Sequence, residues 1–307
     1  MKVSLVATVK DARHGIDEFL ESLARQTRKP DEVVIVDGGS ADGTVEVLRG
    51  ADWVTLIEEP GANIARGRNL AVRAATHDVI AVSDADCVLA PDWLERLLEP
   101  IRRGADVAMG SYRPLVGGFF EACAAAVSVP ELDELHPDRF LPSARSVAFR
   151  REIFDAAGRY PEWLDIGEDM FVNLRWRELG ARMELAPDAQ VWWRPRSTLA
   201  EHWRQYAAYA RGDAIAGMHA RRHAIRFGVY AGLAAALASR RRAPLVLAAA
   251  AGALYAARPV IRARRLARSN RERAAAVAVM PALLGFTDVA KMTGYVAGLL
   301  SRRRTPR

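Results

Sequence analysis

The sequence is poor in cysteine and in aromatic residues. Only Cys87 and Cys123 are present among its 307 residues, they form no CxxC pair, and Phe, Trp and Tyr together make up 7%. A disulfide framework is therefore excluded, and a reducing compartment with two structural thiols is the natural interpretation. A secretory leader is not predicted, because the apolar run after Lys2 is broken by Lys10 and Asp11 and is typical of a first strand.

Long apolar runs are also missing. A bilayer span needs about 20 consecutive apolar residues, and residues 228–257 reach that length only by including Arg240, Arg241 and Arg242. Each arginine would be costly at the bilayer centre. For residues 216–307 we therefore expect a helical, Ala/Arg-rich, membrane-associated region, built as a short hairpin or as interfacial helices rather than as crossing helices. The alternative is a helical subdomain packed on the rest of the chain or on a second subunit.

Acidic residues become scarce in the last third of the chain. The formal net charge is +7, and arginine clusters occur at 240–242, 262–268 and 302–304. Such a region attracts nucleic acid and anionic membranes by the same long-range field. Because the arginines flank Ala/Leu stretches rather than alternating with base-reading polar groups, we expect a membrane surface and no nucleic acid as the partner.

The remainder of the sequence alternates apolar runs with helical segments. Residues 3–9 and 32–37 are apolar runs rich in β-branched residues, residues 16–25 have helical spacing, and residues 79–83 form another buried-type run. This alternation predicts an α/β domain over 1–215, with a Rossmann-like, mostly parallel sheet flanked by helices.

Polar side chains occur where three of these runs end. Thr8 lies near the end of the first, Asp37 ends the second, and Asp84-Ala-Asp86 follows the third. Since the binding crevice of a parallel sheet lies beyond the carboxyl ends of its strands, we expect these groups to meet there. Asp84 and Asp86 can share Mg²⁺ or Mn²⁺ with the oxygens of a diphosphate, although an Asp-x-Asp triplet is also common in solvated turns.

Two further groups suit a nucleotide-sugar. Asp37 can accept hydrogen bonds from a base or ribose, whereas the glycines and the Ser/Thr residues after it are explained by tight turning and helix capping. Arg66 and Arg68 open a helix, where guanidinium groups and the helix N-terminus both favour phosphate. Each of the two arginines can equally be a solvated helix residue.

Glu168 and Asp169 begin another predicted helix, at 168–180. Interaction with the helix dipole explains acids there, but a carboxylate held across the crevice from the metal can also deprotonate an acceptor hydroxyl, which makes Asp169 the candidate base. Sugar stacking, phosphate contact, membrane-interface packing and core packing are all open to the aromatic and basic stretch that follows. The acceptor or phosphate candidates are Glu168, Trp193, Arg194, His202, Arg204 and Arg211.

Taken together, five segments resemble the inverting family 2 glycosyltransferases of the GT-A fold. In chain order they read Val-Ala-Thr-Val-Lys, Val-Val-Ile-Val-Asp-Gly-Gly-Ser-Ala-Asp-Gly-Thr, Ala-Arg-Gly-Arg-Asn, Ser-Asp-Ala-Asp and Gly-Glu-Asp-Met-Phe. The resemblance covers about residues 1–215 and implies that Asp37 contacts the nucleoside and that Asp169 is the base. It also implies that Asp86 holds the metal, with Asp84 on the nucleotide or the metal.

The sequence departs from the family pattern at two places, and these departures indicate which members of the family it resembles. The second run ends in Asp-Gly-Gly where many relatives have Asp-Asp-Gly, and the Gln-x-x-Arg-Trp motif of processive synthases is missing. The chain is therefore similar to the membrane-associated, non-processive members, and the segment Phe286–Tyr295 resembles their C-terminal tails.

This resemblance implies a metal-dependent, inverting, hexosyltransferase-like enzyme at the cytoplasmic face of the cell membrane. Its partners would be a UDP- or GDP-sugar donor and a lipid-linked or glycan acceptor, with Mn²⁺ or Mg²⁺ as cofactor. One alternative is a non-catalytic nucleotide-binding membrane module, which has no need for Asp169. The other is a nucleotidyltransferase, although the Gly-rich, Lys-bearing phosphate loop expected at its first turn is missing from residues 8–15.

Overall fold

The computed structural model describes residues 1–302, which form two compact units. The first unit consists of Met1–Arg113 and Leu132–Arg194, and the second of Pro114–Glu131 and the chain from Pro195 onward. Arg303 and Arg304, from the third arginine cluster, lie outside the described residues.

The division between the units differs from the predicted boundary near residue 215. Helix α8 (Leu199–Ala216) is grouped with the C-terminal helices. It lies very close to α11 (Asn270–Arg302), since a Cβ atom added at Gly294 would come within 2.0 Å of the carbonyl oxygen of Ala207. Glycines at this helix contact thus allow α8 to pack closely against α11.

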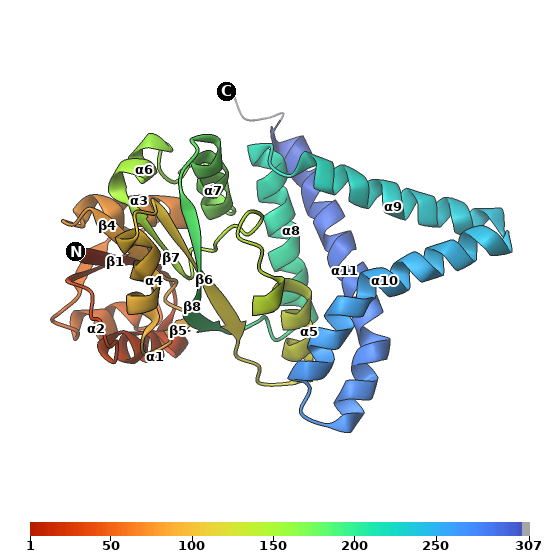
Figure 1. Ribbon diagram of the computed structural model, residues 1–307, viewed down its shortest axis with the longest axis horizontal. Coiled ribbons are helices and arrows are strands. Elements are labelled where there is room, and N and C mark those ends of the chain that lie inside the picture. Colours follow the sequence, from red (N-terminus) through yellow and green to blue (C-terminus); the bar gives the residue numbers. More distant parts are fainter. Residues whose placement is uncertain (303–307) are drawn as a thin grey trace. The chain divides into compact units, whose positions relative to one another are not determined.

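The first unit is built on one eight-stranded sheet with the order β3-β2-β1-β4-β7-β6-β8-β5 (Figure 1). Its strands are β1 (Val3–Val9), β2 (Glu32–Asp37), β3 (Thr55–Glu58), β4 (Val79–Val82), β5 (Cys87–Leu89), β6 (Val107–Pro114), β7 (Val147–Arg150) and β8 (Met183–Trp193). The half formed by β3, β2, β1 and β4 is parallel, as predicted. The pairs β4–β7, β6–β7 and β5–β8 are antiparallel, so the sheet as a whole is mixed.

Helices cover this sheet, and its core is aliphatic and aromatic. The helices are α1 (Arg13–Ala24), α2 (Thr44–Arg49), α3 (Ile64–Ala74), α4 (Trp93–Arg102), α6 (Arg151–Ala156) and α7 (Glu168–Glu178), with a short 3₁₀ turn at Leu132–Glu134. One core cluster joins valines of β1, β2 and β4 to Phe149, Phe154 and Trp176. The ring of Phe149 lies 4.9 Å from that of Phe154 and 5.3 Å from that of Trp176, which fixes β7 against α6 and α7.

The second unit is helical. It contains α5 (Phe119–Ser128), α8, α9 (Ala220–Ser239), α10 (Arg242–Leu266) and α11. Helices α9 and α10 meet at a turn where Arg240 adopts a left-handed conformation with φ of 52°, and they diverge towards α8 and α11 (Figure 1). The apolar stretch 228–257 is therefore broken at its arginines into the two arms of a hairpin. Within the described residues, α10 and α11 are long and apolar enough to cross a membrane by length and composition alone.

Candidate active site

The parallel half of the sheet brings the predicted strand-end residues to one edge. Thr8 and Val9 of β1 lie opposite Val36 and Asp37 of β2, while Val6 lies opposite Val82, the last residue of β4. Asp84 and Asp86 follow β4 in the chain, and so leave the sheet at the same edge.

Asp37 is almost completely buried, with 1% of its surface exposed. Its Oδ1 accepts hydrogen bonds from the backbone N–H groups of Gly39 and Ser40, at 2.8 and 2.9 Å, and its Oδ2 accepts one from the Ser40 hydroxyl at 2.5 Å. Gly39 has φ of 93°, a left-handed conformation that favours glycine. The Asp37 carboxylate thus fixes the conformation of the loop after β2, at the edge of the sheet where the strands end.

Helix α3 approaches β1 closely at Thr8. A Cβ atom added at Gly67 would lie 2.7 Å from Cγ2 of Thr8, so only glycine allows this spacing. The helix begins at Ile64 because the side chain of Asn63 accepts a hydrogen bond from the backbone N–H of Arg66 at 2.9 Å. Cap and glycine together place the first turn of α3, with its two arginines, beside the strand ends.

The two arginines of α3 have different environments. Arg66 is half exposed and pairs with Glu59 at 2.5 Å and with Glu162 at 3.7 Å. Arg68 is 4% exposed, donates to Asp84 Oδ1 at 2.6 Å, and also pairs with Glu168. The guanidinium of Arg68 is thus directed at two carboxylates.

Buried charge dominates this three-residue cluster. Burial alone would lower the pKa of Arg68, but the charges of Asp84 and Glu168 raise it above its usual range. Burial raises the pKa of Glu168 to about 7, against the opposing charge of Arg68. Arg68 therefore links the residue after β4 to the first residue of α7, and a proton can reside on Glu168 near neutral pH.

Arg145 is a site residue that the sequence analysis missed. Its Nε lies 3.9 Å from Asp84 Oδ2, and its Cζ lies 4.4 Å from the centre of the Trp193 ring and 5.6 Å from that of Tyr112. In the antiparallel register Val82 faces Val147, which brings Arg145 opposite Asp84. The predicted stacking residue Trp193 is thus 4% exposed and supports a cation in the structure.

Asp169 lies beside this cluster at the start of α7. Its Oδ1 accepts from the Met170 N–H at 2.7 Å, and its Oδ2 accepts from the Ala144 N–H at 3.3 Å. The second contact ties Asp169 to the loop that carries Arg145, while the neighbouring Glu168 is paired with Arg68. The candidate base, Asp84 of the Asp-x-Asp triplet, Arg68 and Arg145 therefore belong to one connected group.

The carboxylates of this group fit a divalent metal that takes further oxygens from its substrate. Asp86 is exposed and Asp84 is about one quarter exposed, and both are hard oxygen donors. Residues 1–302 contain no group of three or more acidic, His or Cys side chains placed to hold a metal ion. Mg²⁺ and Mn²⁺ often bind through one or two carboxylates plus phosphate oxygens, so Asp84 and Asp86 are the candidate protein ligands. Burial and the charge of Asp86 raise the pKa of the Cys87 thiol, which keeps it protonated.

The remaining acceptor candidates are Arg194 and three residues of α8. Arg194 is half exposed and pairs with Glu18 at 2.6 Å. His202, Arg204 and Arg211 lie on α8, in the second unit. His202 is 1% exposed and its Nε2 lies 2.8 Å from the Thr287 hydroxyl; burial lowers its pKa to about 4, so it is a neutral packing residue.

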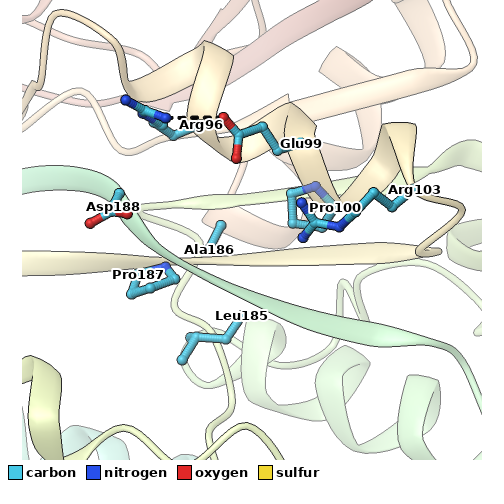
Figure 2. Close-up of a pocket in the computed structure, with 8 residues that line it drawn as sticks. All are labelled: Arg96, Glu99, Pro100, Arg103, Leu185, Ala186, Pro187 and Asp188. Carbon is cyan, nitrogen blue, oxygen red and sulfur yellow. Dashed lines mark hydrogen bonds and ion pairs between the residues drawn. The ribbon is translucent and has the colours of Figure 1, made fainter.

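A separate small pocket lies between α4 and β8 (Figure 2). Its walls include Arg96 and Glu99, whose side chains pair at 3.2 Å, and on the β8 side Pro187 and Asp188. None of its lining residues belongs to the carboxylate and arginine group, so the pocket is not a part of that site.

Comparison with known families matches the chain to glycosyltransferases. Residues 4–121 match the family model "Glycosyl transferase family 2", and residues 79–287 match "Glycosyl transferase family group 2". The chain is similar to the O-antigen chain rhamnosyltransferase RfbN of Salmonella typhimurium, with 24% identity over 221 residues, covering 67% of this chain and 70% of that protein.

Two solved structures have a similar fold. Mannosyltransferase PcManGT from Pyrobaculum calidifontis, in complex with GDP-Man and Mn²⁺, matches with a TM-score of 0.63 and 23% identity, over 95% of this chain and 87% of that one. TarS 1–349 of S. aureus, in complex with UDP-GlcNAc, matches with a TM-score of 0.55 and 17% identity, over 99% of this chain and 92% of that one. At these identities the two structures support the fold alone.

Proposed function

The chain belongs to glycosyltransferase family 2 and has the GT-A fold, and from that premise we propose that it is a metal-dependent, inverting hexosyltransferase. The donor would be a UDP- or GDP-sugar and the acceptor a lipid-linked or glycan hydroxyl. The observation that carries this proposal is the connected group of Asp84, Arg68, Glu168 and Asp169. It joins Asp84, a candidate metal ligand, to a candidate base on a different element.

The roles of the carboxylates follow from their environments. A divalent metal bound by Asp86 and Asp84 would neutralise the departing diphosphate. Asp169 would accept the proton of the acceptor hydroxyl as its oxygen forms a bond to the anomeric carbon. The bond from that carbon to the diphosphate oxygen breaks in the same displacement, so the nucleoside diphosphate leaves with the electron pair and the anomeric configuration inverts.

The remaining residues of the site would bind the donor or position the carboxylates. Arg145 stacks on Trp193 and lies 3.9 Å from Asp84, farther than the directly paired Arg68, so we assign its guanidinium to the donor diphosphate. Arg66, which is exposed, is a second phosphate candidate, whereas Arg68 positions Asp84 and Glu168 rather than contacting the donor. Asp37 and Thr8 would shape the nucleoside side of the edge.

We place the reaction at the cytoplasmic face of a membrane. The free cysteines suit a reducing compartment, the C-terminal helices are apolar and rich in arginine, and a curated relative is named for the O-antigen chain. These features favour a lipid-linked or envelope-glycan acceptor over a soluble one.

Thermal shift with UDP, GDP and dTDP, each with and without Mn²⁺ or Mg²⁺, tests the donor site. We expect one nucleotide to raise the melting temperature only with metal, and Asp86→Ala to lose this response. Stabilisation by the same nucleotide without any metal would contradict the proposed metal role.

Turnover of Asp169→Asn tests the chemistry. Retained nucleotide binding with loss of sugar transfer supports the base, with Asp165→Asn as an exposed acidic control. A wild type that binds nucleotide but never releases nucleoside diphosphate would favour the non-catalytic module. Release of inorganic diphosphate with a nucleotide left on the product would identify a nucleotidyltransferase.

A further inference from the structure

The distal part of the α9–α10 hairpin is apolar on all sides. Residues 227–239 of α9 and 243–257 of α10 carry Tyr230, Ser239 and Tyr255 as their only polar side chains. Leucines here are widely exposed, for example Leu247 at 71%, and only 6% of the apolar window of α10 is buried within the protein. A helix that is hydrophobic all round belongs in a core or in lipid. Because this one is exposed in the folded chain, lipid is its natural environment.

Arginines bound these stretches at both ends. Arg240, Arg241 and Arg242 form the turn, and Arg226 and Arg258 delimit the other ends of the two apolar arms. Residues 214–271 contain no aspartate or glutamate. A charge distribution of this kind complements two layers of anionic headgroups.

A buried carboxylate closes the base of the hairpin. Asp288 of α11 is 5% exposed, and its Oδ1 pairs with Arg226 Nε at 2.8 Å. The hydroxyls of Tyr230 and Tyr255 donate to its Oδ2 at 3.2 and 3.0 Å. Tyr230 follows Arg226 by four residues and Tyr255 precedes Arg258 by three, so both arms are attached to α11 near their arginine-flanked base.

Three arrangements of the hairpin in a membrane can be compared. Lying flat in the interface requires a polar face, which these arms lack. Insertion to half depth would put the three arginines of the turn at the bilayer centre, where each is costly. Crossing requires the arms to approach the thickness of the hydrocarbon core, about 30 Å. The two stretches span about 20 and 22 Å at 1.5 Å per residue, and arginine side chains at both ends extend this reach towards the headgroups.

Because the structure places the three arginines at the turn and not within an arm, we propose, in place of the non-crossing arrangement expected from the sequence, that the α9–α10 hairpin crosses a bilayer with anionic headgroups, its arginine turn in one headgroup layer and its base at the other. This inference deepens the membrane location in the proposed function, and it does not depend on sugar transfer.

Two serines on either side of α10, Ser239 at the end of α9 and Ser269 just before α11, allow a direct test. Ser239→Cys and Ser269→Cys would each be expressed in the full-length chain and treated with a membrane-impermeant maleimide, in intact spheroplasts and in inverted membrane vesicles. Wild type, whose Cys87 and Cys123 are buried, gives the background. We expect the two cysteines to be labelled from opposite sides. Labelling of both from the same side, or recovery of the chain in the soluble fraction, would overturn the proposal.

Leu247→Glu provides a second measurement. This side chain contacts solvent in the folded chain, so the substitution leaves folding of the protein itself intact. If the arm is in lipid, the variant becomes extractable from vesicles of phosphatidylcholine and phosphatidylglycerol by alkaline carbonate, whereas wild type stays in the pellet. Equal extraction of both proteins would contradict lipid insertion. Nucleotide-dependent thermal stabilisation, measured in parallel, reports on the donor site and separates failure of this inference from failure of the proposed enzyme.

Discussion

The two arginines of α3 give a sharp test of how the site is held together. Arg68→Met removes the cation shared by Asp84 and Glu168, while Arg66→Met, two residues away on the same helix, removes an exposed cation. Methionine is a good helix former of similar length, so helix propensity changes little in either case.

The expected magnitudes differ several-fold. Removing one partner of a buried ion pair costs roughly 3 to 5 kcal/mol, because the remaining charge stays buried without compensation. The side chains of Arg68 and Glu168 are both 5% exposed, so this range applies. Loss of an exposed pair costs about 0 to 1 kcal/mol. At roughly 2 to 4 °C per kcal/mol for a unit of this size, Arg68→Met should lower the melting temperature by roughly 6 to 20 °C and Arg66→Met by at most about 4 °C.

Thermal melts of the full-length chain at pH 6 and pH 8 measure both effects. Glu168 can relieve part of the cost by taking up a proton, since its pKa is already raised to about 7. The Arg68→Met loss should therefore be smaller at pH 6. Adding Glu168→Met to Arg68→Met should recover part of the loss, because it removes the stranded carboxylate. Equal destabilisation by Arg66→Met and Arg68→Met would refute the reasoning.

Three further outcomes follow from single contacts. Burial raises the pKa of Glu168 from 4.5 to about 7, so the folded state binds its proton more tightly than the unfolded state does. The stabilisation from this proton is complete below pH 4.5 and is lost as the pH rises through 7. Wild type should therefore lose stability relative to Glu168→Gln between pH 5 and 8, and plots of unfolding free energy against pH that run parallel for the two proteins would contradict this. Gly67→Ala should cost roughly 1 to 3 kcal/mol in urea unfolding, because its Cβ meets Thr8 Cγ2; Thr8→Ser should restore part of it, and no rescue would exclude that clash. Arg145→Gln should weaken nucleoside diphosphate binding about tenfold in calorimetry. Arg145→Lys should not restore the affinity, because lysine lacks the planar guanidinium that stacks on Trp193. Full affinity in the lysine variant would show that stacking on Trp193 is not needed for binding.

The site was predictable where it depends on parallel strands. Thr8, Asp37 and the Asp84/Asp86 triplet were expected to meet because each follows an apolar run, and the register of β1 with β2 and β4 places them at one edge. The pattern of side chains along a strand is local, so burial of a run and the location of its end can be inferred from the run itself.

The charge pairing at that edge could not be predicted in the same way. Arg68 was expected to face phosphate, but its partners are carboxylates from β4 and α7. Arg145 carries no motif, and it reaches Asp84 only because β7 pairs with β4 in an antiparallel register. Which charges neutralise one another depends on long-range pairing, which leaves no periodic signal in either segment.

The sequence by itself determined the family and the α/β core, because these depend on composition, periodicity and short motifs. Only the tertiary structure decided the antiparallel half of the sheet, where Pro187 and Asp188 obscure β8 as a strand. It also decided that α8 packs with α11, through glycines that let two helix backbones approach. The burial pattern of a segment can be inferred from its own residues. Strand register, charge partners and helix contacts depend instead on which distant segments pack together.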